Sequence, residues 1–207
     1  MAASDPNLTA YVLTALRDVV SVQFAFNIQD IDVPVALMTS GLGSVAGAIQ
    51  QNRITVRPMT EYTGVAGAGA AYSNDNDTIY VPTDFVNRSP SDQRTYDMGT
   101  VIHEGTHAYF DLIAAQHLTH ATGEAGAYLV AALYYEARHY AVKPANDTFT
   151  LTLLEAARLT NRVKTPGVTL KRPDFADLRA AIVTHYKRLK ATYRGDTIMS
   201  GLGVRAS

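Results

Sequence analysis

The 207-residue sequence predicts one α+β domain over residues 1–207, with a small antiparallel sheet followed by a helical C-terminal part. Two observations predict this class. Between residues 53 and 81, short segments have the alternation and residue types of half-buried strands. From residue 91 onward, apolar residues recur every three or four positions, which is typical of amphipathic helices. No break in composition indicates a linker between the two parts.

Short strands are expected in the first part of the chain, after one helix. That helix begins at the Asp5-Pro6 pair, because proline is favoured in the first helical turn. A stretch punctuated by glycine follows at 41–47. The expected strands are residues 53–57, 70–73 and 78–81. The last two flank an Asn/Asp-rich turn, and they are expected to pair as a hairpin because such side chains satisfy turn backbone and tolerate positive φ.

Helices account for most of the remaining chain. Their expected ranges are residues 91 to about 113, 124 to about 140, 149 to 163 and 174 to 193. On the first of them, Met98, Ile102 and Tyr109 fall on one stripe when successive residues are set about 100° apart. This stripe is therefore expected to face the core.

Composition limits the possible partners and ligands. The 18 Lys and Arg nearly balance the 19 Asp and Glu, and no basic patch of useful size is visible, so neither nucleic acid nor a membrane is an expected partner. The absence of Cys excludes disulfides, a Cys nucleophile and a thiolate zinc site. A metal ion must then be held by His and carboxylates. The N-terminal segment lacks the regions of a secretory signal, so we expect a cytoplasmic protein, or one exported without a cleavable signal.

One pentapeptide carries recognisable chemistry: His103-Glu104-Gly105-Thr106-His107, on the helix that begins near residue 91. Histidines at positions i and i+4 project from one face on successive turns, so both imidazoles can reach a single Zn²⁺. They lie opposite the apolar stripe, where they can line a cleft. Glu104 projects beside them and can accept a proton from a zinc-bound water that attacks a carbonyl.

A third protein ligand is required, and four side chains are candidates. Asp111 lies one turn beyond His107, but three ligands in a row on one straight helix fan out along its axis. We expect Asp111 to support the ligands instead. His117 and His120 lie at the end of the helix or in the following loop. Glu124 begins the next helix, and the sixteen intervening residues let the chain turn and present its carboxylate from a facing helix.

The HExxH pentapeptide, followed by Gly123-Glu124-Ala125-Gly126-Ala127-Tyr128, resembles the HExxH…E arrangement of the gluzincin metallopeptidases, the thermolysin-like clan. The resemblance covers roughly residues 50–140. It implies a zincin-like fold in a minimal single-domain form, with Zn²⁺ bound by His103, His107 and Glu124. It implies that Glu104 is the general base and proton shuttle. It also implies that the hairpin lies beside the cleft and pairs with an extended peptide or protein substrate.

Gluzincins usually supply a further Tyr or His donor to the developing oxyanion. The two foremost candidates are Tyr128, one turn after Glu124, and His185, in the last expected helix. The expected function is zinc-dependent hydrolysis of peptide or amide bonds. The alternative is a catalytically silent zincin-fold module for binding or regulation. Glu104 favours the hydrolase, because a pure ligand scaffold needs no base beside the metal. Substrate preference and oligomeric state are not predicted.

Overall fold

The computed structural model describes residues 4–64, 69–89, 91–115, 117–143, 145 and 147–199. In these residues the chain is mixed α/β, with six α-helices and two three-stranded sheets. The helices are α1 (Pro6–Asp18), α2 (Thr39–Gln50), α3 (Asp92–Leu112), α4 (His120–Ala137), α5 (Thr148–Val163) and α6 (Ala176–Leu189). The strands are β1 (Ala25–Gln29), β2 (Val35–Met38), β3 (Thr55–Pro58), β4 (Ala71–Ser73), β5 (Thr78–Val81) and β6 (Val168–Lys171).

The first sheet has the order β3-β5-β4 and contains the predicted hairpin. β4 and β5 pair antiparallel, with Ala71 opposite Tyr80, so the hairpin is confirmed. The prediction of a wholly antiparallel sheet is wrong, because β3 runs parallel to β5. The chain passes from β3 to the far edge of the sheet before it returns through the hairpin. β4 therefore forms an edge of this sheet.

A second sheet, of order β2-β1-β6, and helix α2 were not expected from the sequence. β6 follows α5 and pairs parallel with β1, more than 130 residues earlier in the chain. Helix α2 includes the glycine-punctuated stretch 41–47. It forms because Leu42, Val45 and Ile49 are buried on its inner face. Gly41 permits this packing, since a Cβ there would lie 2.7 Å from the ring of Tyr109 on α3.

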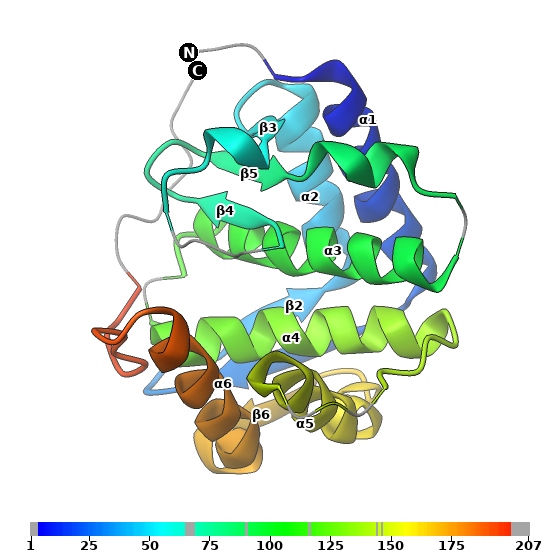
Figure 1. The fold of residues 1–207 in the computed structure, drawn as a ribbon. Helices are drawn as coiled ribbons and strands as arrows, with labels where there is room; N and C mark the ends of the chain where they lie inside the picture. Colours follow the sequence, from blue (N-terminus) through cyan, green and yellow to red (C-terminus); the bar gives the residue numbers. More distant parts are fainter. Residues whose placement is uncertain are drawn as a thin grey trace.

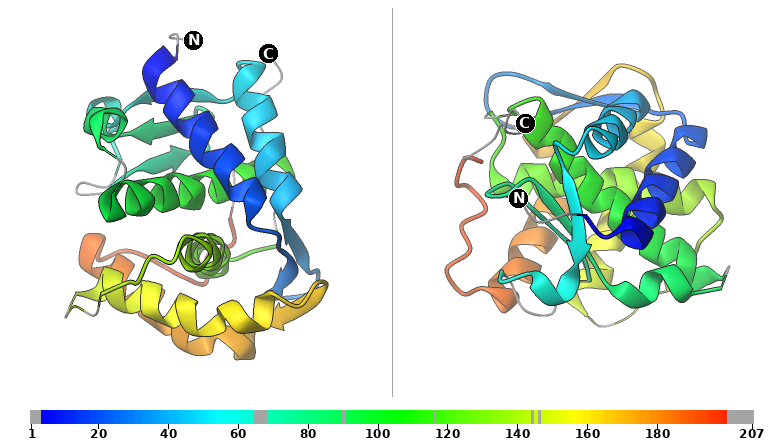
Figure 2. Two further views of the ribbon diagram at one scale, coloured as in Figure 1. Left: turned by 90° about the vertical axis from the view of Figure 1, so that its right-hand side faces the viewer. Right: turned by 90° about the horizontal axis from the view of Figure 1, so that it is seen from above.

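Helices α3 and α4 lie side by side across the middle of the molecule (Figure 1). The β3-β5-β4 sheet lies on one side of this pair, and α5 and α6 lie on the other (Figures 1 and 2). Helices α1 and α2 stand beside the first sheet and pack on α3 (Figure 2). Gly99 lets α3 and α4 pack closely against each other, because a Cβ at this position would clash with the ring of Tyr135 on α4, 2.1 Å away.

Helix α3 is packed on both of its faces. Met98 and Ile102 are buried as expected, whereas Tyr109 is only partly buried. The opposite face, which carries the histidines, is covered by α4, and His103 is buried. The HExxH motif therefore lies at a helix–helix interface. Among the described residues, no helix has the length and apolar content needed to cross a membrane.

The first turn of α4 is fixed from outside the helix. The Asp30 carboxylate, which follows β1, accepts hydrogen bonds from the Thr119 N–H (3.1 Å) and the Thr122 hydroxyl (2.8 Å). An acceptor at this position satisfies backbone donors that a helix leaves free at its N-terminus. Helix α4 consequently begins at His120, four residues before its expected start, and Glu124 lies inside it.

Candidate metal centre

Three predicted ligands meet between α3 and α4. His103 and His107 lie on consecutive turns of α3, and their Nε2 atoms are 3.2 Å apart. Glu124 faces them from α4, with Oε2 at 3.2 Å from His103 Nε2 and Oε1 at 3.4 Å from His107 Nε2. The three side chains are 10–16% exposed. They lie close enough together to hold one metal ion.

The spacing and chemistry of these donors fit a small divalent ion. Ligands placed tetrahedrally about 2.0–2.1 Å from zinc lie about 3.3–3.4 Å from one another. The two histidine Nε2 atoms are 3.2 Å apart, and each lies 3.2–3.4 Å from a different oxygen of Glu124, which is close to this spacing. Two imidazoles disfavour Ca²⁺ and Mg²⁺, which prefer oxygen ligands. The donor set suits zinc and other first-row transition metals.

The charges of this cluster are mutually stabilising in the absence of metal. Burial by itself lowers the pKa of His107, but the Glu124 carboxylate outweighs it and raises that pKa to about 9. Burial by itself raises the pKa of Glu124, yet the two histidines hold it well below its usual range. The metal-free site therefore holds a proton at neutral pH, and an ion that binds there must displace it.

Tyrosines surround the Glu124 carboxylate. The Tyr186 hydroxyl, from α6, donates a 2.8 Å hydrogen bond to Glu124 Oε2. The ring of Tyr193 stacks on that of Tyr186 with centroids 5.1 Å apart. Burial raises the pKa of Tyr186 well above its ordinary value, so its hydroxyl stays protonated. Tyr186 is not one of the two foremost donors expected from the sequence, because no spacing rule connects α6 to Glu124.

The two predicted oxyanion donors, Tyr128 and His185, both line the cavity beside the cluster. The ring of Tyr128 packs edge-on against His103, with centroids 4.5 Å apart. His185 Nδ1 lies 3.0 Å from the Thr148 hydroxyl, which fixes the orientation of the ring. Their catalytic role stays a prediction.

Glu104 points to the edge strand and not into the ligand cluster. Its Oε2 accepts a 2.7 Å hydrogen bond from the Tyr72 backbone N–H of β4. The Tyr72 hydroxyl donates a 2.5 Å bond to Oδ2 of Asp111, which is fully buried. Among the described residues, neither Asp111 nor His120 belongs to the cluster of possible ligands. Tyr72 thus contacts α3 on both sides of His107, a link that sequence spacing did not indicate.

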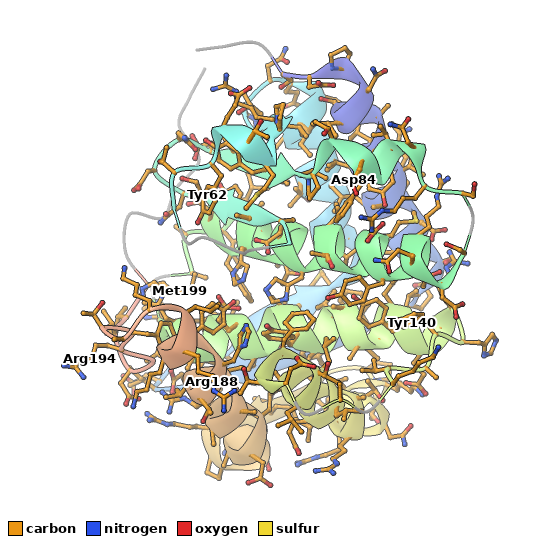
Figure 3. The ribbon with its side chains drawn as sticks, in the orientation of Figure 1. Tyr62, Asp84, Tyr140, Arg188, Arg194 and Met199 are labelled. Carbon is orange, nitrogen blue, oxygen red and sulfur yellow. The ribbon has the colours of Figure 1, made fainter. Side chains whose placement is uncertain are left out.

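A cavity of about 510 Å³ opens onto the cluster. Its walls come from β4, α3, α4, α5 and α6, and Tyr62 and Met199, which are labelled in Figure 3, also line it. Aromatic side chains form much of the wall. They include Tyr96 and Tyr135, whose rings both pack on Tyr140, and Phe149, which packs on Tyr96. Among the described lining residues there is no Lys or Arg, and the carboxylates are those of Glu104 and Glu124.

This geometry is the principal evidence about function. No family model, no curated protein and no solved structure matches the chain.

Proposed function

We propose that this protein is a zinc-dependent hydrolase of peptide or amide bonds, with a zincin-like fold similar to that of minimal gluzincins. The main support for the proposal is the arrangement of four side chains. His103, His107 and Glu124 converge at zinc-compatible distances, whereas Glu104 lies beside them and outside the donor set. A site that only binds metal needs no such carboxylate.

His103, His107 and Glu124 are the residues that would hold the ion. When bound, zinc supplies a Lewis acid that polarises a carbonyl and brings the pKa of a ligated water towards about 7. The carboxylate of Glu104 is the group that takes up a proton in this reaction. The Tyr72 N–H keeps that carboxylate in one orientation, beside the histidines and at the edge strand.

The edge of β4 provides a place for an extended substrate. Because the Tyr72 N–H reaches Glu104, this edge of β4 faces the cavity. A peptide can add to such an edge as a further strand, through backbone groups other than the Tyr72 N–H, which is bonded to Glu104. The cavity volume is within the range of sites that enclose small ligands or side chains. Its aromatic wall suits uncharged side chains on the substrate.

Three hydroxyl or imidazole groups can donate to a developing oxyanion. Tyr128 and His185 are the two predicted from sequence, and Tyr186 joins them because it also lines the cavity and contacts Glu124. A donor of this kind contributes about 2.7–4 kcal/mol where it has been measured in other enzymes.

Zinc-loaded protein should hydrolyse a set of internally quenched peptides. Glu104→Gln should retain about one zinc ion per chain and lose hydrolysis by at least about 100-fold, because the base is removed and the ligands remain. His107→Ala should lose both zinc and activity. Equal peptide turnover by wild type and Glu104→Gln would contradict the proposal. Zinc binding by a wild type that cleaves no peptide would favour the silent binding module.

A further inference from the structure

Four positively charged side chains at the end of α6 have no ion-pair partner among the described residues: Lys187, Arg188, Lys190 and Arg194. All four are exposed. By contrast, eight other Lys and Arg side chains form ion pairs. The four lie within eight consecutive residues that include no Asp or Glu.

The composition of the whole chain does not reveal this local excess of positive charge. Outside the four residues the chain has 14 Lys and Arg against 19 Asp and Glu. Cations in the last turn of a helix interact favourably with its dipole, which accounts for Lys187 and Arg188. Lys190 and Arg194 lie beyond the helix, so the dipole does not account for them. We call the four residues the basic rim.

The basic rim lies at one end of the cavity. Leu189, between two of its members, lines the cavity together with His120 and Met199. Arg194 and Met199 lie on the same side of the molecule, whereas Tyr140 marks the opposite end of α4 (Figure 3). Tyr96 and Tyr135, which line the cavity and pack on Tyr140, therefore lie toward the end of α4 opposite Arg194.

We propose that the basic rim binds an acidic segment of the peptide substrate, on one side only of the bond that is cut. This inference rests on the proposed function and specifies its substrate class. No Lys or Arg is among the described residues that line the cavity, whereas the basic rim flanks Leu189, which does line it. Acidic side chains of a substrate are therefore attracted just outside the cavity.

Matched quenched peptides test this proposal. All would share one uncharged central sequence and carry two Glu on one flank, two Glu on the other flank, or Gln at all of these positions. Exposed charge pairs are each weak, so kcat/KM should rise about threefold to tenfold for one acidic flank only. The preference should disappear near 1 M salt, where the Debye length is about 3 Å.

Lys190→Gln combined with Arg194→Gln should remove most of the preference and leave cleavage of the neutral peptide unchanged. The matched control is Arg17→Gln with Lys143→Gln, which removes two exposed charges that do not line the cavity and should keep the preference. Equal cleavage of acidic and neutral peptides by wild type would contradict the role proposed for the basic rim and leave the proposed function intact. An unchanged preference in the Lys190→Gln, Arg194→Gln variant would also contradict that role.

A wild type that cleaves none of the peptides would instead overturn the proposed function. In that case the role of the basic rim is tested by binding alone. Fluorescence anisotropy would measure how the same labelled peptides bind to zinc-loaded Glu104→Gln. Rim-dependent binding of the acidic peptide supports the inference, and equal binding of all peptides overturns it. Rim-dependent sedimentation with phosphatidylserine vesicles, without any peptide preference, would overturn it in favour of a membrane surface.

Discussion

Replacing Tyr186 by Phe should weaken zinc binding without removing a zinc ligand. The change deletes one hydroxyl, which donates the 2.8 Å hydrogen bond to Glu124 Oε2. A bond from a neutral donor to a carboxylate contributes about 1.5–3 kcal/mol. Loss of such an outer contact typically reduces metal affinity about 10- to 100-fold, equivalent to about 1.4–2.8 kcal/mol. We therefore expect the zinc Kd of Tyr186→Phe to rise by this factor.

The assay is a competition titration against a chromophoric zinc chelator at constant pH. Tyr72→Phe is the matched control, since it removes a hydroxyl from the same cavity whose partner, Asp111, lies outside the ligand cluster. That variant should lose stability, because Asp111 is buried, and its zinc Kd should change by less than about threefold. An unchanged Kd in Tyr186→Phe, or an equal rise in both variants, would refute the reasoning.

Two further predictions concern the stability of the metal-free protein. Because Glu124 raises the pKa of His107 to about 9, their interaction stabilises the fold fully between about pH 4.5 and pH 6.5, where Glu124 is ionised in the folded and unfolded protein, and is lost as the pH rises through about 9. The Tm of chelator-treated protein should therefore fall between about pH 6.5 and pH 9. Glu124→Gln should abolish this fall. A wild-type Tm that does not change over the same pH range would contradict the prediction. Gly99→Ala should cost about 1–3 kcal/mol in urea unfolding, because its Cβ meets Tyr135. The control Gly43→Ala, with open space around it in α2, should gain about 0.5–1 kcal/mol, and equal effects would contradict the packing argument.

Local rules predicted the elements in which neighbouring residues determine the structure. Helix α1 begins at Pro6 because Asp5 accepts hydrogen bonds from its first N–H groups. The i, i+4 spacing places His103 and His107 on one face of α3. The number of residues before Glu124 allows α4 to turn back against α3. Each of these inferences depends on chain connectivity over a few turns, which a single sequence contains.

Contacts between distant segments determined the rest. The glycines of α2 disfavour a helix locally, and burial against α3 overrides that preference. β6 pairs with β1, which lies near the other end of the chain. The start of α4 depends on Asp30, about 90 residues earlier. Likewise, Tyr72 and Tyr186 reach the site from β4 and α6. No periodicity within one segment encodes such partners.

The function proposed for this chain depends on a single zinc ion held between α3 and α4. Anomalous scattering at the zinc absorption edge, from a crystal of the zinc-loaded protein, tests that claim most directly. We expect one peak about 2.0–2.2 Å from His103 Nε2, His107 Nε2 and an oxygen of Glu124, with Glu104 outside bonding distance. A peak ligated by Glu104 or Asp111, or no peak between these two helices, would contradict the assignment.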